Sequence, residues 1–148
     1  MIVKLPFFLF IGVFSSLTSI NAQDVDNGPI PKDFTCEGTL IVEKPKYKST
    51  IPGYEKHVKK EFEDYKGKYV IATKEEIETN DLYQDKKTYP FILHVEWRQV
   101  FGGQNIGLRM WFFLENREAG RRYNGIGEKQ TFKETTEHTV RMLNGNCK

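Results

Sequence analysis

The chain has 148 residues, with 22 Lys and Arg against 20 Asp and Glu, and a formal net charge of +2. This length is typical of one domain and is enough to bury one hydrophobic core. Nucleic-acid binding is excluded as an expected function, because affinity for phosphate backbones usually requires a clear excess of basic residues.

Residues 1–22 have the layout of a secretory signal peptide. Lys4 supplies a positive charge, residues 5–14 are apolar, and the small residue Ala22 precedes a charged segment that begins at Gln23. This pattern predicts cleavage between Ala22 and Gln23. The apolar run is about half the ~20 residues that a bilayer span needs. We therefore expect a secreted, extracellular protein without a transmembrane segment.

The 126 residues that remain after cleavage are expected to form one domain preceded by a short tail. Residues 23–33 contain two prolines, three aspartates and little to bury, which predicts a disordered N-terminal tail. Residues 34–148 are then a single globular α+β domain.

Two cysteines, Cys36 and Cys147, stand at opposite ends of this domain. An even number of cysteines in an exported protein predicts a disulfide. Closing a loop of roughly 100 residues stabilises the fold by up to ~4.7 kcal/mol in the chain-entropy model. Two free thiols or an intermolecular bridge are the alternatives.

The first half of the domain predicts two strands and one helix. Residues 35–43 alternate as a strand does, with Leu40 and Val42 on one face. Apolar residues then recur at intervals of four, four and three, which predicts a helix over residues 53–66 that Gly67 ends. These residues are Tyr54, Val58, Phe62 and Tyr65. Residues 69–73 predict a second strand, and the charged residues 74–87 a frayed strand end and loop.

Residues 91–101 and 108–115 predict an aromatic hairpin that turns at Gly102-Gly103. A two-residue loop there opposes Trp97 to Leu108, Val95 to Met110, Leu93 to Phe112, Glu96 to Arg109 and His94 to Trp111. A register shifted by two residues would oppose Arg98 to Arg109, which is a pair of like charges, so the first register is preferred.

The end of the chain predicts more strands. A turn is expected at Ala119-Gly120 or Asn124-Gly125, then a strand within residues 128–132 and a last strand over residues 135–143. The predicted fold class is α+β, with one helix packed on a curved antiparallel sheet of five to six strands. The helix covers the face that contains Leu93, Val95, Met110 and Phe112. A cystatin-like architecture, a closed barrel and a sandwich are the alternatives.

No residue pattern identifies a catalytic, cofactor or metal site. Ser49 is the only serine after residue 22 and lacks a Gly-x-Ser-x-Gly context, and the three histidines are not at metal-ligand spacing. His94 and Glu96 share one strand face and could form an acid–base pair, or they are simply the polar side of a sheet. We expect no enzyme activity, no cofactor and no metal.

The second face of the hairpin is more informative, because it carries Ile92, Trp111 and Phe113 and one helix cannot cover both faces. This face must be core under further sheet, the wall of an apolar cavity, or a partner surface. The sequence leaves all three interpretations open.

The segment Gln99-Val100-Phe101-Gly102-Gly103 resembles the Gln-x-Val-x-Gly hairpin loop of cystatins, and the order of strand, helix and sheet is similar to theirs. This resemblance implies a loop that enters the active-site cleft of papain-like proteases. Phe101 stands where the motif has valine, no Pro-Trp pair follows, and the family's usual two disulfides are absent. The chain is therefore not assigned to the family, and a coincidental Gly-Gly hairpin is the alternative.

Together these patterns predict a secreted, non-enzymatic and monomeric binding or interaction module. Its expected partner is an extracellular protein or a small apolar ligand. The alternatives are a cystatin-like cysteine protease inhibitor and a carrier of a small apolar ligand. The candidate binding residues are His94, Gln99, Val100, Phe101, Gly102, Gly103, Trp111 and Phe113.

Overall fold

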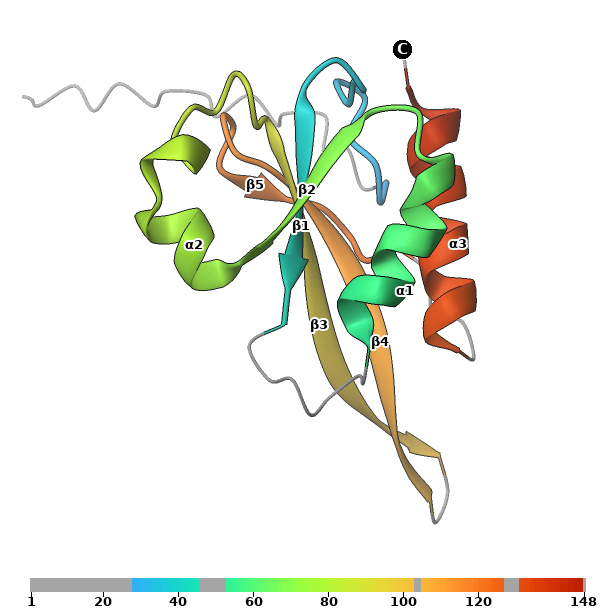
Figure 1. The fold of residues 1–148 in the computed structure, drawn as a ribbon. Coiled ribbons are helices and arrows are strands. Elements are labelled where there is room, and N and C mark those ends of the chain that lie inside the picture. Colours follow the sequence, from blue (N-terminus) through green and yellow to red (C-terminus); the bar gives the residue numbers. More distant parts are fainter. Residues whose placement is uncertain (1–27, 46–52, 103–104, 127–130, 148) are drawn as a thin grey trace, which may run out of the picture.

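Five strands form one open, mixed sheet with three α-helices around it (Figure 1). The structure, a computed structural model, describes residues 28–45, 53–102, 105–126 and 131–147, and the side chains of residues 97–109 lie outside that description. The strands are β1 (Thr39–Lys44), β2 (Lys68–Thr73), β3 (Phe91–Gly102), β4 (Asn105–Asn116) and β5 (Arg121–Arg122). The helices are α1 (Tyr54–Glu61), α2 (Lys74–Thr79) and α3 (Phe132–Gly145), with 3₁₀ turns at Phe62–Asp64 and Asp81–Tyr83.

The α+β class and the five strands are confirmed, but the fully antiparallel sheet is wrong. The strand order is β2-β1-β3-β4-β5, and β1 pairs in parallel with both β2 and β3. The reason is that α1 separates β1 from β2 and α2 lies between β2 and β3. Parallel neighbours need a long crossover connection, which is usually a helix, whereas a tight turn can join only antiparallel neighbours. The sheet does not close, so the barrel alternative is wrong, and a cystatin-like architecture is not confirmed.

One face of the sheet carries the main core, and the predicted stripe of α1 is part of it. Tyr54, Val58 and Phe62 are buried against the face that contains Leu93 and Phe112. The helix ends earlier than predicted, since the 3₁₀ turn stops at Asp64, before Gly67. In Figure 1, α1 and α3 lie together on this face and α2 lies on the other.

The last predicted strand, over residues 135–143, is wrong because this segment is α3. Its buried residues recur with helical spacing: Thr135, Thr136, Thr139, Val140 and Leu143. The helix begins at an N-cap, where the Thr131 side chain accepts a hydrogen bond from the Glu134 N–H. Buried threonines were misleading, because β-branched residues favour strands. In α3 their hydroxyls donate to main-chain carbonyls one turn back, as Thr139 does to Thr135 at 2.8 Å.

The loop predicted over residues 74–87 is also wrong in part, because it contains α2. Thr73 and Glu76 form a reciprocal capping box at its start. Ile77 is the one residue of this short helix that is buried, so hydrophobic spacing alone could not have indicated a helix.

The hairpin is present, but its register is the one that was rejected. Arg98 pairs with Arg109 and Val95 with Phe112, two residues away from every predicted pair. Gly102 pairs with Asn105 and belongs to β3, so the turn predicted at Gly102-Gly103 is wrong at Gly102, and Gly103 lies outside the described residues. Because the shift is by two residues, each side chain keeps its predicted face. One opposed pair of arginines therefore does not decide the register of these two 12-residue strands.

Several remaining predictions concern the ends of the domain. Ile30, within the predicted tail, is 8% exposed and belongs to the core, so this segment does have something to bury. The turn at Ala119-Gly120 is confirmed, with Gly120 at a positive φ of 60°. Of the strand predicted within residues 128–132, residues 128–130 lie outside the description, and Phe132 begins α3.

The predicted Cys36–Cys147 disulfide is present, with the two Cα atoms 5.1 Å apart. It connects the segment before β1 to the residues just after α3. The disulfide therefore attaches a helix to the start of the domain, and not the last strand that was predicted there. The Tyr65 hydroxyl donates a hydrogen bond to Cys36 Sγ at 3.5 Å. Within the described residues, none of the helices has the length and apolar character of a membrane span.

The helical assignment of α3 can be tested with three alanine variants. Val140→Ala and Leu143→Ala should both reduce the free energy of unfolding, by about 1–3 and 2–5 kcal/mol, because both side chains are buried. Arg141→Ala, on the exposed side, should change it by less than about 0.5 kcal/mol. Chemical denaturation measures all three. In a strand, residues 141 and 143 would share a face opposite residue 140, so equal losses at 141 and 143 would contradict the helix.

Candidate functional site

The second face of the sheet is covered at two places, with a cleft between them. Near α2, a small cluster of buried residues closes the face: Ile41, Ala72, Ile77, Tyr89 and Ile92. Near β5, Phe113 is 7% exposed, and the Arg122 guanidinium lies 4.5 Å from its ring centroid. A Cβ added to Gly125 would lie 2.8 Å from the Trp111 ring, so this segment packs tightly on the hairpin.

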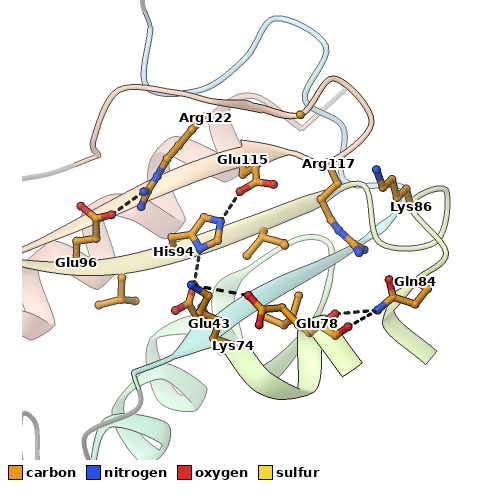
Figure 2. A pocket seen from close by; sticks show the side chains of 14 residues that line it. Glu43, Lys74, Glu78, Gln84, Lys86, His94, Glu96, Glu115, Arg117 and Arg122 are labelled. Atoms are coloured by element: carbon orange, nitrogen blue, oxygen red, sulfur yellow. Dashed lines mark hydrogen bonds and ion pairs between the residues drawn. The ribbon is translucent and has the colours of Figure 1, made fainter. Parts of the chain in front are cut away.

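Most of the side chains that line the cleft between these two regions are charged or polar, and the apolar ones are Ile77, Ile92 and Val95 (Figure 2). It has a volume of about 710 Å³ and takes residues from β1, α2, β3, β4, β5 and the connecting loops. Its charged and titratable lining residues include Glu43, His94, Glu96, Glu115, Arg117 and Arg122.

His94 lies at the centre of the cleft and contacts one carboxylate on each neighbouring strand. Its Nδ1 is hydrogen bonded to Glu43 of β1, and its Nε2 to Glu115 of β4 at 2.7 Å. The strand order requires this arrangement, since β3 lies between β1 and β4. The side chains of His94, Glu43 and Glu115 are 20%, 15% and 32% exposed, respectively. Each strand thus contributes one titratable group to a mostly buried Glu43–His94–Glu115 cluster.

The electrostatics of this cluster favour the charged imidazolium. Burial alone would lower the pKa of His94, but the hydrogen bonds to Glu43 and Glu115 and their negative charges together raise it above its ordinary value. A doubly protonated ring donates from both nitrogens, which is what two flanking carboxylates require. At neutral pH the His94 ring therefore carries more positive charge than the ring of a free histidine would.

Several of the other charged side chains that line the cleft form ion pairs with one another. Glu96 of β3 forms an ion pair with Arg122 of β5 at 2.6 Å, and Lys74 of α2 pairs with Glu78 at 3.7 Å. Arg117 differs from these. It is 7% exposed, and its Nη1 donates to the main-chain carbonyl of Tyr89 at 3.0 Å. Burial lowers the pKa of Arg117, and the negative charges of Glu115 and Asp85 partly oppose this.

Of the residues predicted from sequence, the structure places His94 in the cleft. Its partners are Glu43 and Glu115, whereas Glu96 contacts Arg122 instead. Trp111 and Phe113 are not among the lining residues and pack under residues 121–126. Gln99, Val100, Phe101 and Gly102 form the far end of β3, away from the cleft, and Gly103 lies outside the description.

Sequence reasoning missed Glu43, Glu115 and Arg117. One signal was present, because Glu43 follows Ile41 and Glu115 follows Phe113 on the same strand face, each a charge beside an apolar residue. What could not be inferred was that β1 lies beside β3. In the part of the chain that the structure describes, no group of His, Cys, Asp or Glu side chains, the Glu43–His94–Glu115 cluster included, is arranged to hold a metal ion.

Comparison of the chain with protein-family models, curated proteins and solved structures finds no match. The function is therefore argued from the geometry of the cleft.

The Glu43–His94–Glu115 cluster makes stability depend on pH. Because the folded-state pKa of His94 is raised above the value of about 6.5 that it has when unfolded, its contribution is fully present below pH 6.5. The contribution is lost as the pH rises through the raised pKa. His94→Gln should remove this loss, so the wild-type advantage over the variant should be larger at pH 5.5 than at pH 9.

Urea unfolding at a series of pH values measures this difference. His57→Gln, at an exposed position on α1, is the control and should follow the wild-type profile. A wild-type advantage over His94→Gln that grows with pH would contradict the prediction.

Proposed function

We propose that this protein is a secreted, non-enzymatic and monomeric binding protein, and that the cleft around His94 binds a small polar ligand. The observation that carries the proposal is the convergence of charged side chains from five elements on one concave site. Secretion is supported by the signal-peptide layout of residues 1–22 and by the Cys36–Cys147 disulfide.

A structural role alone is a poor explanation for so many charges on this face. Desolvating a charged group costs several kcal/mol unless its partners compensate, and an apolar replacement often leaves a fold more stable. Charged groups gathered in a cleft are common at sites selected for recognition. The cleft volume of about 710 Å³ also lies within the range of small-molecule sites.

The arrangement around His94 supports binding rather than catalysis. A general acid or base needs a ring nitrogen within hydrogen-bond reach of the substrate. Here Glu43 and Glu115 occupy both ring nitrogens. Both glutamates line the cleft, and each carboxylate has a second oxygen that can accept a hydrogen bond, which suits a ligand with hydroxyl or amino groups.

The same lining favours a polar ligand over the apolar one expected from sequence. Of the apolar side chains that suggested an apolar cavity, Phe113 packs beneath Arg122 and does not line the cleft, whereas Ile92 packs beneath α2 and still lines it. The charged side chains of the lining outnumber the apolar ones, which are Ile77, Ile92 and Val95.

Contact with a protein through the hairpin is a second candidate function. β3 and β4 have 12 residues each, whereas β1 pairs with β3 only at Ile92 and Leu93, so the hairpin projects beyond the body of the domain (Figure 1). The cystatin resemblance of residues 99–103 lies at this projecting end. Sub-micromolar inhibition of papain would favour this candidate.

The binding role of the cleft can be tested by blocking it from α2. Glu78→Trp places a large ring at the edge of the cleft from an exposed position, so it should abolish ligand binding with little effect on stability. Glu75→Trp, which is exposed on the same helix but does not line the cleft, is the matched control. Native mass spectrometry of protein purified from culture medium measures bound ligand.

The expected result is a polar small molecule bound to the wild type and to Glu75→Trp and missing from Glu78→Trp. The mass should also correspond to a chain that begins at Gln23. Equal occupancy in both tryptophan variants, or no ligand in the wild type, would contradict the proposal.

A further inference from the structure

Arg117 is a buried cation whose hydrogen-bonding capacity is largely unused within the described residues. It follows β4, and its main-chain N–H donates to the Pro90 carbonyl at 2.9 Å, which fixes the position of the residue. A guanidinium has five N–H donors. Of these, the side chain uses Nη1 for the Tyr89 carbonyl at 3.0 Å. The side chain lines the cleft and points into it from the β4 wall (Figure 2).

No carboxylate among the described residues lies within ion-pair distance of this guanidinium, although Glu115 and Asp85 are near enough to act on it electrostatically. The other arginine drawn in Figure 2, Arg122, has a direct partner in Glu96. Arginines are almost never buried unless they are paired, because an uncompensated buried charge costs several kcal/mol. A site that keeps such a group favours a counter-ion that comes from outside the chain.

We infer that Arg117 is the anion-binding group of the cleft and that the ligand carries a carboxylate or a phosphate. This inference rests on the proposed function and specifies its ligand. The planar fork of a guanidinium matches both oxyanions with two parallel hydrogen bonds. Lys86 lines the same end of the cleft and adds a second positive charge there.

The centre of the cleft, around His94, has the complementary chemistry. The carboxylates of Glu43 and Glu115 accept hydrogen bonds beside His94 and repel an anion. The ligand class is therefore a small oxyanion with hydroxyl or amino groups, with its anionic end at Arg117 and its donor groups toward Glu43 and Glu115.

Inorganic phosphate and succinate are suitable probes, titrated by calorimetry at an ionic strength held constant with sodium chloride. The wild type should bind at least one of them saturably, and Arg117→Met should weaken that binding at least tenfold. Arg141→Met, which removes an exposed arginine on α3, should bind as the wild type does. Preference for phosphate or for succinate identifies which oxyanion the ligand carries.

A second measurement on the wild type does not depend on the folding of any variant. The Nε–H resonance of Arg117 should shift saturably as the preferred probe is added, while that of Arg141 should not. Undiminished binding by Arg117→Met, no saturable binding by the wild type, or an unresponsive Arg117 resonance would each overturn the inference.

Failure of this inference can be distinguished from failure of the proposed function. If the ligand that copurifies with the wild type is still bound by Arg117→Met but is missing from Glu78→Trp, the cleft is a binding site and Arg117 is not its anion-binding group. If Glu78→Trp retains the ligand as well, the cleft itself is not the site.

Discussion

The parallel pairing of β1 with β3 is the constraint on which the site depends. Only two residue pairs, Ile41 with Ile92 and Val42 with Leu93, define this contact. They place Glu43 one step beyond the pairing, beside His94, and they leave β4 on the opposite side of β3. A parallel contact of this kind requires a crossover connection, which the chain builds from α1, β2 and α2. Of these elements, α2 also forms one wall of the cleft.

The two faces of the sheet differ in what they bury. One face is covered by α1 and α3 and contains the larger buried cluster, which stabilises the fold through apolar burial. The other is covered only in part, by α2 and by residues 121–126, so charged groups remain between them. The free energy available from the first face lets the second retain groups such as Arg117 and the Glu43–His94–Glu115 cluster, which a fold selected for stability alone would replace.

The strength of the charge interactions follows from partial burial. Glu43 and His94 are mostly removed from water, so their attraction is screened less than that of exposed pairs such as Lys59 and Glu55. The same low screening makes Arg117 sensitive to an anion that enters the cleft. A partly buried cleft therefore combines weaker screening than an exposed face has with more contact with solvent than a closed core has.

The sequence by itself determined what depends on local patterns. The stripe of Tyr54, Val58 and Phe62 was sufficient to predict α1, alternation was sufficient to predict the hairpin strands and their faces, and the cysteine count predicted the disulfide. Local patterns failed at α3, where buried threonines have strand propensity but satisfy their hydroxyls within a helix. They also failed at the short helix α2, which has a single buried anchor at Ile77.

Only the tertiary structure decided the strand order, the hairpin register and the composition of the cleft. Residues 43, 94 and 115 are separated by 51 and 21 positions, and no periodicity along the chain relates them. Side chains alternate between the two faces of a strand, and this alternation determined which face His94 takes. A shift of two residues leaves every side chain on the same face, so local spacing could not choose between the two registers. The partners of a side chain across strands depend on which strands are neighbours, and that choice follows from packing of the whole chain.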